Sequence, residues 1–459
     1  MHNRGGVRRA THAFAGWAAA GPWGLIAQFP APLEVRPLHV FKGRGECASN
    51  HPQPAAATHP PPTPAPGFGH SDPMTQHADT IALAQRLVRC PSRAGIDDYG
   101  PVLGVLEDWL AGRELPYRRL HGEDGGVVGL LIEVAGGLPG PWWALDACVD
   151  TAPYGDESAW TFPPDCGDVV DGWLRGRGAA DSKLAAAMFC AVAAELRDRA
   201  SGLRGGLAVL LDVDEHTGGF GGARAYLTDP GAVRPAGVMI GYPGLDEVVV
   251  GGRGLWRATI AVHAASGHSG SRGTAPGAVS RAARLIRLLE AAELPGAEGD
   301  FPLPPKLTVT FCHGGQGFSV VPDLCELGVD IRTTPGFDAD AAERLVREAV
   351  AELDSRVPAP RPTVISPVAS WPPYRLAEPE QPAAALLDAA AREGLTVRAK
   401  TAGPSNIGNL LAGEGIPATA GFGVRYAGLH GVDERACLQD LPAVHAAYRH
   451  AVLGLLGPS

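Results

Sequence analysis

Short apolar segments that fit strands alternate with longer segments that fit helices, from about residue 81 to the end of the chain. Residues 127–134, 142–145, 206–213 and 237–241 are expected to form buried strands, and the alanine-rich stretch 184–196 is expected to form a helix. This alternation is typical of an α/β fold, in which helices cover the faces of a sheet. In such folds ligands bind at the carboxyl ends of the strands.

A second group of elements begins after Arg253. It is predicted to contain strands at 256–263, 306–311 and 325–331 and helices at 279–289 and 341–353. Strand, helix, two strands and helix form a small α+β layer. The chain then returns with elements at 383–393, 417–420 and 441–456. We therefore predict a main domain from residues 77–252 and 365–459, with a central mixed sheet flanked by helices, interrupted at 253–364 by an α+β (ferredoxin-like) unit.

The first 76 residues differ from the rest of the chain. The Pro/Ala/His-rich stretch Pro52–Pro66 has no periodic apolar face, so we interpret residues 1–76 as a disordered extension or a mis-assigned start. The apolar segment after Arg8 and Arg9 is a weak candidate for a secretory signal, but Gly, Trp and Pro interrupt it. We favour a translation start near Met74, just before the first amphipathic helix.

Composition and charge narrow the classes of function. With 459 residues, 45% hydrophobic, and a net charge of −10 without a strongly basic block, the chain is typical of a globular protein that does not bind nucleic acid. It contains no run of about eighteen apolar residues, so we expect no membrane span. Its eight cysteines lack paired spacing, which favours reduced thiols and a cytoplasmic location. Cys90, Cys190 and Cys312 are expected to be packing residues.

One carboxylate and two imidazoles stand out as candidate metal ligands. Asp181 follows a glycine-rich turn, His216 comes just after the strand at 206–213, and His430 lies in a late loop. Asp, His and His can hold zinc with one position left for water, whose pKa then falls towards about 7. Glu215 is placed to move the proton. Each residue taken alone also fits an ordinary helix cap, a solvated turn or a surface position.

Five segments together carry a resemblance to a known family. Their order and spacing resemble the di-zinc metallopeptidase and amidohydrolase family that includes aminoacylase, acetylornithine deacetylase, succinyl-diaminopimelate desuccinylase and glutamate carboxypeptidase. The likeness covers nearly everything from Ile81 onward, and Gly176-Arg177-Gly178 with Asp181 and Lys183 is an especially close match. The segments are 145–153, 176–183, 214–219, 240–244 and 429–434.

The resemblance implies a role for each matching residue. Asp181 would be the carboxylate that bridges two metals, Glu215 the general base, and His216 and His430 ligands of one metal. Asp150 matches a carboxylate that orients the first histidine ligand by a hydrogen bond.

Two departures from the family pattern fall on ligands of the same metal. The first histidine is Cys148 here, and the carboxylate expected before Pro243 is Tyr242. Tyrosine is a poor zinc ligand at neutral pH because its pKa is about 10. We therefore expect a single-metal enzyme. Two alternatives stay open: two metals with Cys148 as thiolate and Asp246 or Glu247 as a replacement ligand, or a scaffold that now serves a binding or biosynthetic role.

The unit at 253–364 resembles the family's smaller domain, which implies a homodimer. His268 matches a histidine that reaches the partner's active site and stabilises the oxyanion, and Ser319 stands where an Asn is expected. Arg332 would clamp a substrate carboxylate, although a pairing with Asp330 or Asp323 is an equal alternative. Gly403 and Asn406 match a substrate loop.

These residues imply a metal-dependent hydrolase of an amide bond. The expected substrate is an N-acyl amino acid or small peptide with a free carboxylate. The expected cofactor is zinc, as one or two ions, with cobalt or manganese as substitutes.

Overall fold

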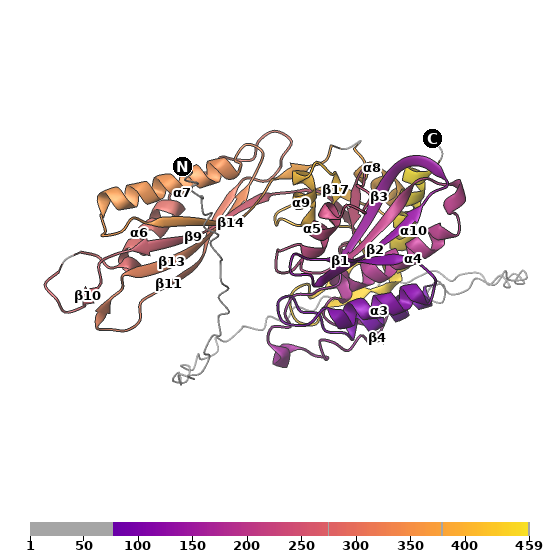
Figure 1. Ribbon diagram of the computed structural model, residues 1–459, viewed down its shortest axis with the longest axis horizontal. Coiled ribbons are helices and arrows are strands. Elements are labelled where there is room, and N and C mark those ends of the chain that lie inside the picture. The colour runs from indigo at the N-terminus through magenta and orange to yellow at the C-terminus, as the bar shows by residue number, and fades with distance from the viewer. Residues whose placement is uncertain (1–76, 274, 378–379, 458–459) are drawn as a thin grey trace, which may run out of the picture. The chain divides into compact units, whose positions relative to one another are not determined.

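The computed structural model describes residues 77–273, 275–377 and 380–457, which all belong to one unit of the chain (Figure 1). The predictions for residues 1–76, including the start near Met74, lie outside the described residues. Mixed sheets and helices make up the described part, so the predicted α/β class is confirmed. Among the described helices, none has the length and apolar character needed to cross a bilayer.

A six-stranded mixed sheet forms the centre of the main domain. Strand β3 lies parallel to β6 and β7, and β17 is parallel to β7, whereas β1 and β2 are antiparallel to their neighbours. In spatial order the strands are β1 (Tyr117–His121), β2 (Val127–Ala135), β6 (Arg204–Asp212), β3 (Leu138–Cys148), β7 (Val238–Ile240) and β17 (Ala418–Thr419). Because β3 and β6 are parallel, Cys148 and Asp212 end side by side at one edge of the sheet.

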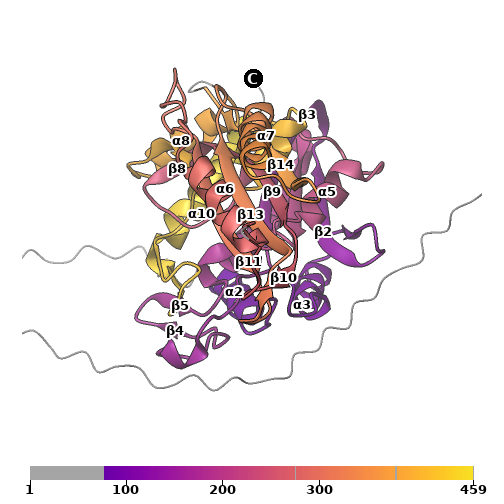
Figure 2. The ribbon, with the colours of Figure 1, turned by 90° about the vertical axis from the view of Figure 1, so that its left-hand side faces the viewer.

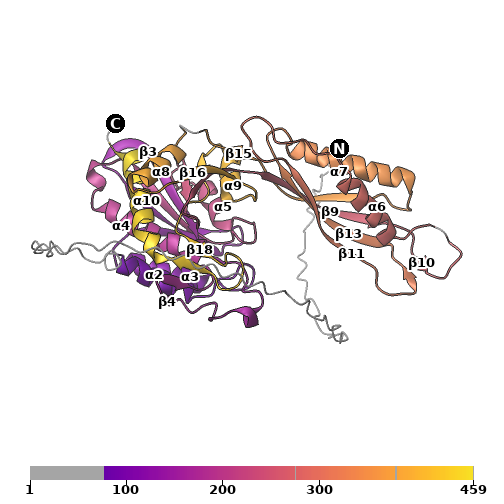
Figure 3. The ribbon, with the colours of Figure 1, turned by 180° about the vertical axis from the view of Figure 1, so that it is seen from behind.

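Helices cover both faces of this sheet, as the strand alternation requires. Leu145 and Ala147 of β3 face one core and Ala144 faces the other. Figure 3 shows α8 and α10 side by side on the first face. That face is covered by α2 (Ala78–Val88), α3 (Gly100–Ala111), α4 (Leu184–Arg197), α8 (Ala383–Arg392) and α10 (Leu441–Leu456). The other face is covered by α5 (Gly221–Thr228) and α9 (Ile407–Gly413).

The inserted unit follows the strand, helix, two strands, helix, strand order of a ferredoxin-like layer. Its antiparallel sheet has the order β11, β13, β9, β14, and α6 and α7 pack on one face over a core of their own (Figures 1 and 2). The elements in chain order are β9 (Gly254–His263), α6 (Ala278–Glu290), β11 (Lys306–Gly314), β13 (Leu324–Thr333), α7 (Ala339–Arg356) and β14 (Val364–Trp371).

Strand β14 was not foreseen from the sequence. It contains Pro367, which cannot donate a backbone hydrogen bond and is tolerated here because β14 is an edge strand with a bulge between Pro367 and Ala369. The inserted sheet therefore extends beyond residue 364, where we had placed the boundary. We propose that the inserted domain ends near Trp371.

Three small sheets complete the described part. A three-stranded sheet contains β15 (Tyr374–Arg375), β8 (Glu247–Gly252) and β16 (Arg398–Ala402). A four-stranded sheet contains β18 (Tyr426–Ala427), β19 (Arg435–Cys437), β5 (Trp173–Arg175) and β4 (Val169–Val170). A two-stranded ribbon contains β10 (Gly267–His268) and β12 (Val320–Val321).

The cysteines that the structure describes are all unpaired thiols. Cys190 is buried and Cys90 is partly buried, but Cys312 is exposed, so the expectation that Cys312 is a packing residue was wrong. Cys312 lies on β11, an edge strand whose side chains are largely exposed.

Candidate metal centre and active-site cleft

Three of the expected ligands converge at the carboxyl edge of the main sheet. One ligand atom each from Asp181, His216 and His430 lies within 4.8 Å of the others. Asp181 Oδ2 is 2.8 Å from His430 Nε2 and 3.4 Å from His216 Nε2. The two imidazole rings meet edge to face, with centroids 5.3 Å apart. Residues separated by up to 249 positions in the sequence therefore share one site.

Local backbone geometry explains how Asp181 reaches this point. Gly176 and Gly178 have φ values of 132° and 82°, and a Cβ on Gly178 would lie 2.6 Å from Thr151 Cγ2. Only glycine suits such a turn. The turn leads through Asp181 into α4, and the aspartate is only 3% exposed.

A buried ion pair holds this turn against the loop that carries His430. Arg177 Nη1 lies 2.5 Å from Glu434 Oε2, and both side chains are almost fully buried. The other oxygen of Glu434 accepts hydrogen bonds from the backbone N–H groups of Gly178, Ala180 and Asp181 at 3.0, 3.1 and 3.2 Å. Arg177 also donates to the carbonyl of Gly431. Glu434 thus positions two ligand-bearing segments, a role we had not assigned to it from the sequence.

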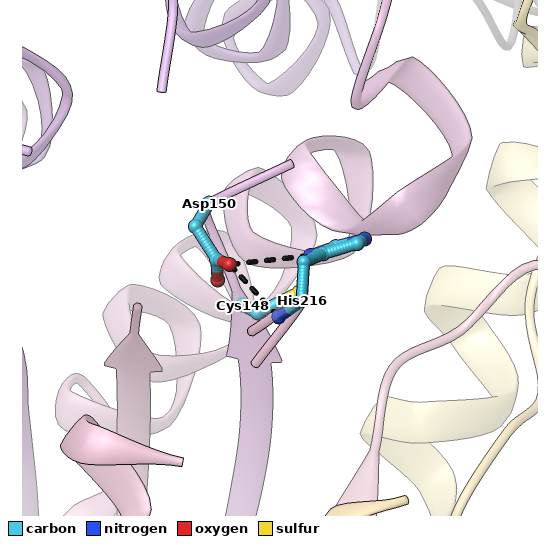
Figure 4. A group of neighbouring side chains, drawn as sticks. All are labelled: Cys148, Asp150 and His216. Carbon is cyan, nitrogen blue, oxygen red and sulfur yellow. Dashed lines mark hydrogen bonds and ion pairs between the residues drawn. The ribbon is translucent and has the colours of Figure 1, made fainter. Parts of the chain in front are cut away.

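Asp150 supports His216. Its carboxylate accepts hydrogen bonds from the backbone N–H groups of Glu215 at 3.2 Å and His216 at 3.0 Å, and Oδ2 lies 3.3 Å from His216 Nδ1 (Figure 4). The resemblance had implied that Asp150 orients the first histidine, and that position is Cys148 here. In this chain the carboxylate instead orients the imidazole at position 216.

A second group, Cys148, Asp150 and His216, also brings its ligand atoms within 4.8 Å (Figure 4). It shares His216 with the first group. Since Nε2 of that ring faces Asp181 and Nδ1 faces Asp150, one imidazole serves both groups. Burial raises the pKa of the Cys148 thiol well above its usual value, and the charges of Glu215 and Asp181 raise it further.

The electrostatics of the first group favour a cation. Burial alone would raise the pKa of Asp181, but hydrogen bonds from His216 and His430 hold it below its usual value. Burial alone would lower the pKa of His216, yet its hydrogen bonds to Asp150 and Asp181 raise it to about 11. A carboxylate with two imidazoles is also an ordinary donor set for zinc. The residues present therefore fit a metal ion.

Glu215 lies beside this centre and lines the same cleft. Burial raises its pKa to about 7, and the charge of Asp181 contributes, while His216 and the thiol of Cys148 act in the opposite direction. A carboxyl group with a pKa near neutrality suits a general base. Asp146 and Asp212 are also buried, and their carboxyl oxygens have no hydrogen-bond partner among the described residues. Burial raises the pKa of both well above normal, and the charge of Glu215 contributes.

The cleft has a volume of about 710 Å³ and is lined by residues from both domains. Of the expected substrate contacts, Arg332, Gly403 and Asn406 line it, whereas Ser319 is an exposed residue outside it. Tyr242, at the doubtful metal-ligand position, also lines it, and His268 is exposed and lies outside it. Asn406 uses its side chain to cap α9 by accepting a hydrogen bond from Gly408 N at 2.9 Å.

Arg332 is both a cleft residue and half of an ion pair. Its Nε lies 2.8 Å from Asp330 Oδ1, and Arg257 Nε lies 2.7 Å from the other oxygen of the same carboxylate. Two guanidinium groups share one carboxylate, so this wall of the cleft keeps an excess positive charge. Arg332 Nη1 also reaches Ser405 Oγ at 3.3 Å, a residue we had not singled out.

Glu247 and Asp246 were considered as replacement ligands for the second metal. Glu247 is already paired with cationic side chains, and Asp246 is exposed. Glu247 forms ion pairs with Arg398, at 2.6 Å, and with Lys400. Hydrogen bonds from Lys400 and Arg398 lower the pKa of Glu247. Asp246 is exposed and is not among the residues that line the cleft.

The fold and this carboxylate–imidazole group define the class: a two-domain α/β protein with a candidate metal centre in a cleft. Residues 144–454 match the family model described as peptidase family M20/M25/M40, and the chain belongs to this family of metal-dependent hydrolases. The resemblance inferred from the five segments is thereby confirmed.

Relatives and solved structures agree with this assignment. The chain is 29% identical over 383 residues to a succinyl-diaminopimelate desuccinylase of Rhodospirillum centenum, which covers 81% of this chain and 96% of that protein. It resembles the fold of an M20 metallo-carboxypeptidase from Sulfolobus solfataricus with a TM-score of 0.67, 14% identity and coverage of 81% and 98%. It also resembles a Bacillus subtilis protein described as a dinuclear metal-binding M20 peptidase, with a TM-score of 0.62, 17% identity and coverage of 83% and 99%.

Proposed function

We propose that this protein hydrolyses the amide bond of an N-acyl amino acid or small peptide. The observation that carries the proposal is the convergence of Asp181, His216 and His430 at a cleft that Glu215 also lines. Asp181, His216 and His430 would hold a divalent metal ion, zinc above all, which would lower the pKa of water and polarise a carbonyl group. Cobalt or manganese can serve in its place.

The chain's own residues supply the remaining chemistry. Glu215 takes a proton from the attacking water and returns it to the leaving amine. Asp150 keeps the His216 ring in one orientation through Nδ1. Arg332 binds the free carboxylate of the substrate through a charge-assisted pair of hydrogen bonds.

The same proposal includes a single metal ion per chain. Support comes from the residues around the second family site: Cys148 is a buried thiol, Tyr242 is a phenol, and Glu247 is already paired with two cations. Asp150 is committed to His216 and two backbone groups. Two tightly held metal ions per chain, measured by elemental analysis, would contradict this part.

A metal titration combined with a panel of N-acyl amino acids and dipeptides tests the function. The holoenzyme should turn over members of the panel, and Glu215→Gln should lower kcat by roughly 10² to 10⁴ with unchanged metal content. Glu247→Gln is the matched control, because it removes a carboxylate from the same cleft that the mechanism does not use. Tight binding of panel members without turnover would instead support a binding or biosynthetic role.

We also propose that the inserted domain mediates a homodimer. Several large apolar side chains of this domain are exposed. They are Val279, Phe311, Phe318, Val320 and Leu324. Dimerisation would bury such residues, and it is the arrangement in which His268 would act on a second copy of the cleft. Light scattering that reports only monomers at micromolar concentration would overturn this.

A further inference from the structure

Tyr242 occupies a fixed position at the edge of the candidate centre. It is separated from the end of β7 only by Gly241, and its backbone N–H donates to the carbonyl of Phe422 at 3.4 Å. Gly421 and Gly423 pack closely against it: a Cβ on Gly423 would lie 2.4 Å from the Tyr242 carbonyl oxygen. Its partly buried side chain lines the cleft together with Asp181, Glu215 and His430.

The hydroxyl of Tyr242 is not used in hydrogen bonds to other described residues of the protein. No side chain or backbone group among the described residues accepts a hydrogen bond from its hydroxyl, although backbone groups and carboxylates surround the site. Burial raises the pKa of Tyr242, and the charges of Asp181 and Glu215 raise it further, so the hydroxyl keeps its proton at neutral pH. The cleft therefore presents a free O–H donor beside the general base.

A donor at this point differs in kind from the carboxylate that the family pattern places before Pro243. A carboxylate accepts hydrogen bonds or binds a cation, whereas a phenol at neutral pH donates. When water attacks an amide carbonyl, negative charge develops on the carbonyl oxygen, and a preorganised donor aimed at that oxygen stabilises the transition state.

We propose that Tyr242 donates a hydrogen bond to the carbonyl oxygen of the scissile amide as it becomes an oxyanion, a role that rests on the proposed amide hydrolysis. The proton stays on Tyr242 throughout, so the residue forms no covalent bond with the substrate. The phenol thus takes over the charge stabilisation that a second cation would provide at an intact family site.

Tyr242→Phe removes only the hydroxyl. We expect kcat to fall by roughly 10² to 10³ with KM changed by less than a few fold. A readout independent of turnover is binding of a phosphonate analogue of an N-acyl amino acid, whose tetrahedral oxyanion imitates the intermediate. Calorimetry should show its Kd rising by a similar factor, with the Kd of the carboxylate product unchanged. Tyr426→Phe is the matched control, because Tyr426 is a second phenol that lines the cleft and is exposed.

Each other result contradicts the proposal in a distinguishable way. Loss of bound metal in Tyr242→Phe would make Tyr242 a ligand rather than a donor. Unchanged kcat and unchanged phosphonate affinity in an active enzyme would remove the donor role and leave amide hydrolysis standing. A wild-type holoenzyme that hydrolyses no member of the amide panel would overturn both proposals.

Discussion

Asp150 Oδ2 lies 3.3 Å from Nδ1 of His216, while Nε2 of the same ring faces Asp181 at 3.4 Å. Asp150 thus fixes the Nδ1 side of the ring. The Nε2 side points to the candidate metal position, to which Asp181 also contributes. A carboxylate–histidine–metal arrangement of this kind fixes the tautomer and strengthens the ligand.

Asp150→Asn should weaken metal binding by about 10- to 100-fold. The amide has a single oxygen, so it cannot accept from the imidazole and both backbone N–H groups that Asp150 now serves. Competition with a chromophoric chelator measures the change in Kd. Asp214→Asn is a suitable control in the same loop. An equal loss of metal affinity in the two variants would show that Asp150 does not specifically orient His216.

Glu434→Ala should lower the free energy of unfolding by about 3–5 kcal/mol, because it leaves Arg177 buried without a counter-charge. The double variant Arg177→Met/Glu434→Leu should recover part of the lost free energy of unfolding, because it contains no unpaired buried charge. Recovery should be incomplete because the N–H groups of Gly178, Ala180 and Asp181 still lack an acceptor. Urea titrations of the metal-free variants measure both quantities, and full recovery would argue against the role of those three bonds.

His445 should make stability depend on pH in the acid range. It is 5% exposed, and burial lowers its pKa to about 4. Between this value and the unfolded pKa of about 6.5, the unfolded chain binds a proton that the folded protein does not, so stability falls as the pH falls. This group should contribute about 3 kcal/mol of loss between pH 7 and pH 4.

Denaturant midpoints at several pH values, compared between the wild type and His445→Gln, test this assignment. The variant should lose the corresponding part of the pH dependence. His450→Gln removes a more exposed histidine from the same helix and serves as the control. Parallel pH profiles for wild type and His445→Gln would refute the assignment.

Arg332→Ala should raise KM for an N-acyl amino acid by roughly 10- to 100-fold, the cost of a lost hydrogen-bonded charge pair. The change in kcat should be smaller, because the carboxylate is bound in ground and transition states alike. The same substrate with its carboxylate amidated should bind poorly to both enzymes and show little difference between them. An equal effect on the amidated substrate would place Arg332 away from the carboxylate.

Sequence reasoning located most of the fold, because the apolar periodicities are strong where strands and helices are buried. Strand β14 was missed because Pro367 interrupts its pattern, and only its edge position makes proline acceptable there. The inserted unit's boundary shifted for the same reason.

The candidate ligands were also identifiable, since Asp181, His216 and His430 follow strands or glycine-rich turns within recognisable motifs. What could not be read from the sequence is how side chains share partners. Distances between segments that lie far apart in the chain decide whether Asp150 contacts Cys148 or His216. They also decide whether Glu434 pairs with Arg177. The burial of Asp146 and Asp212 without hydrogen-bond partners in the part of the chain that the structure describes has no signature in the sequence.

The contact between Glu434 and Asp181 joins positions that are 253 residues apart. A nascent chain therefore cannot assemble its centre until the segment bearing His430 and Glu434 has left the ribosome and docked. At ordinary translation rates the turn around Asp181 waits about 10 to 50 s for that partner. The centre therefore stays incomplete throughout synthesis, and a chain truncated before this segment would lack His430, Glu434 and α10, which covers one face of the main sheet.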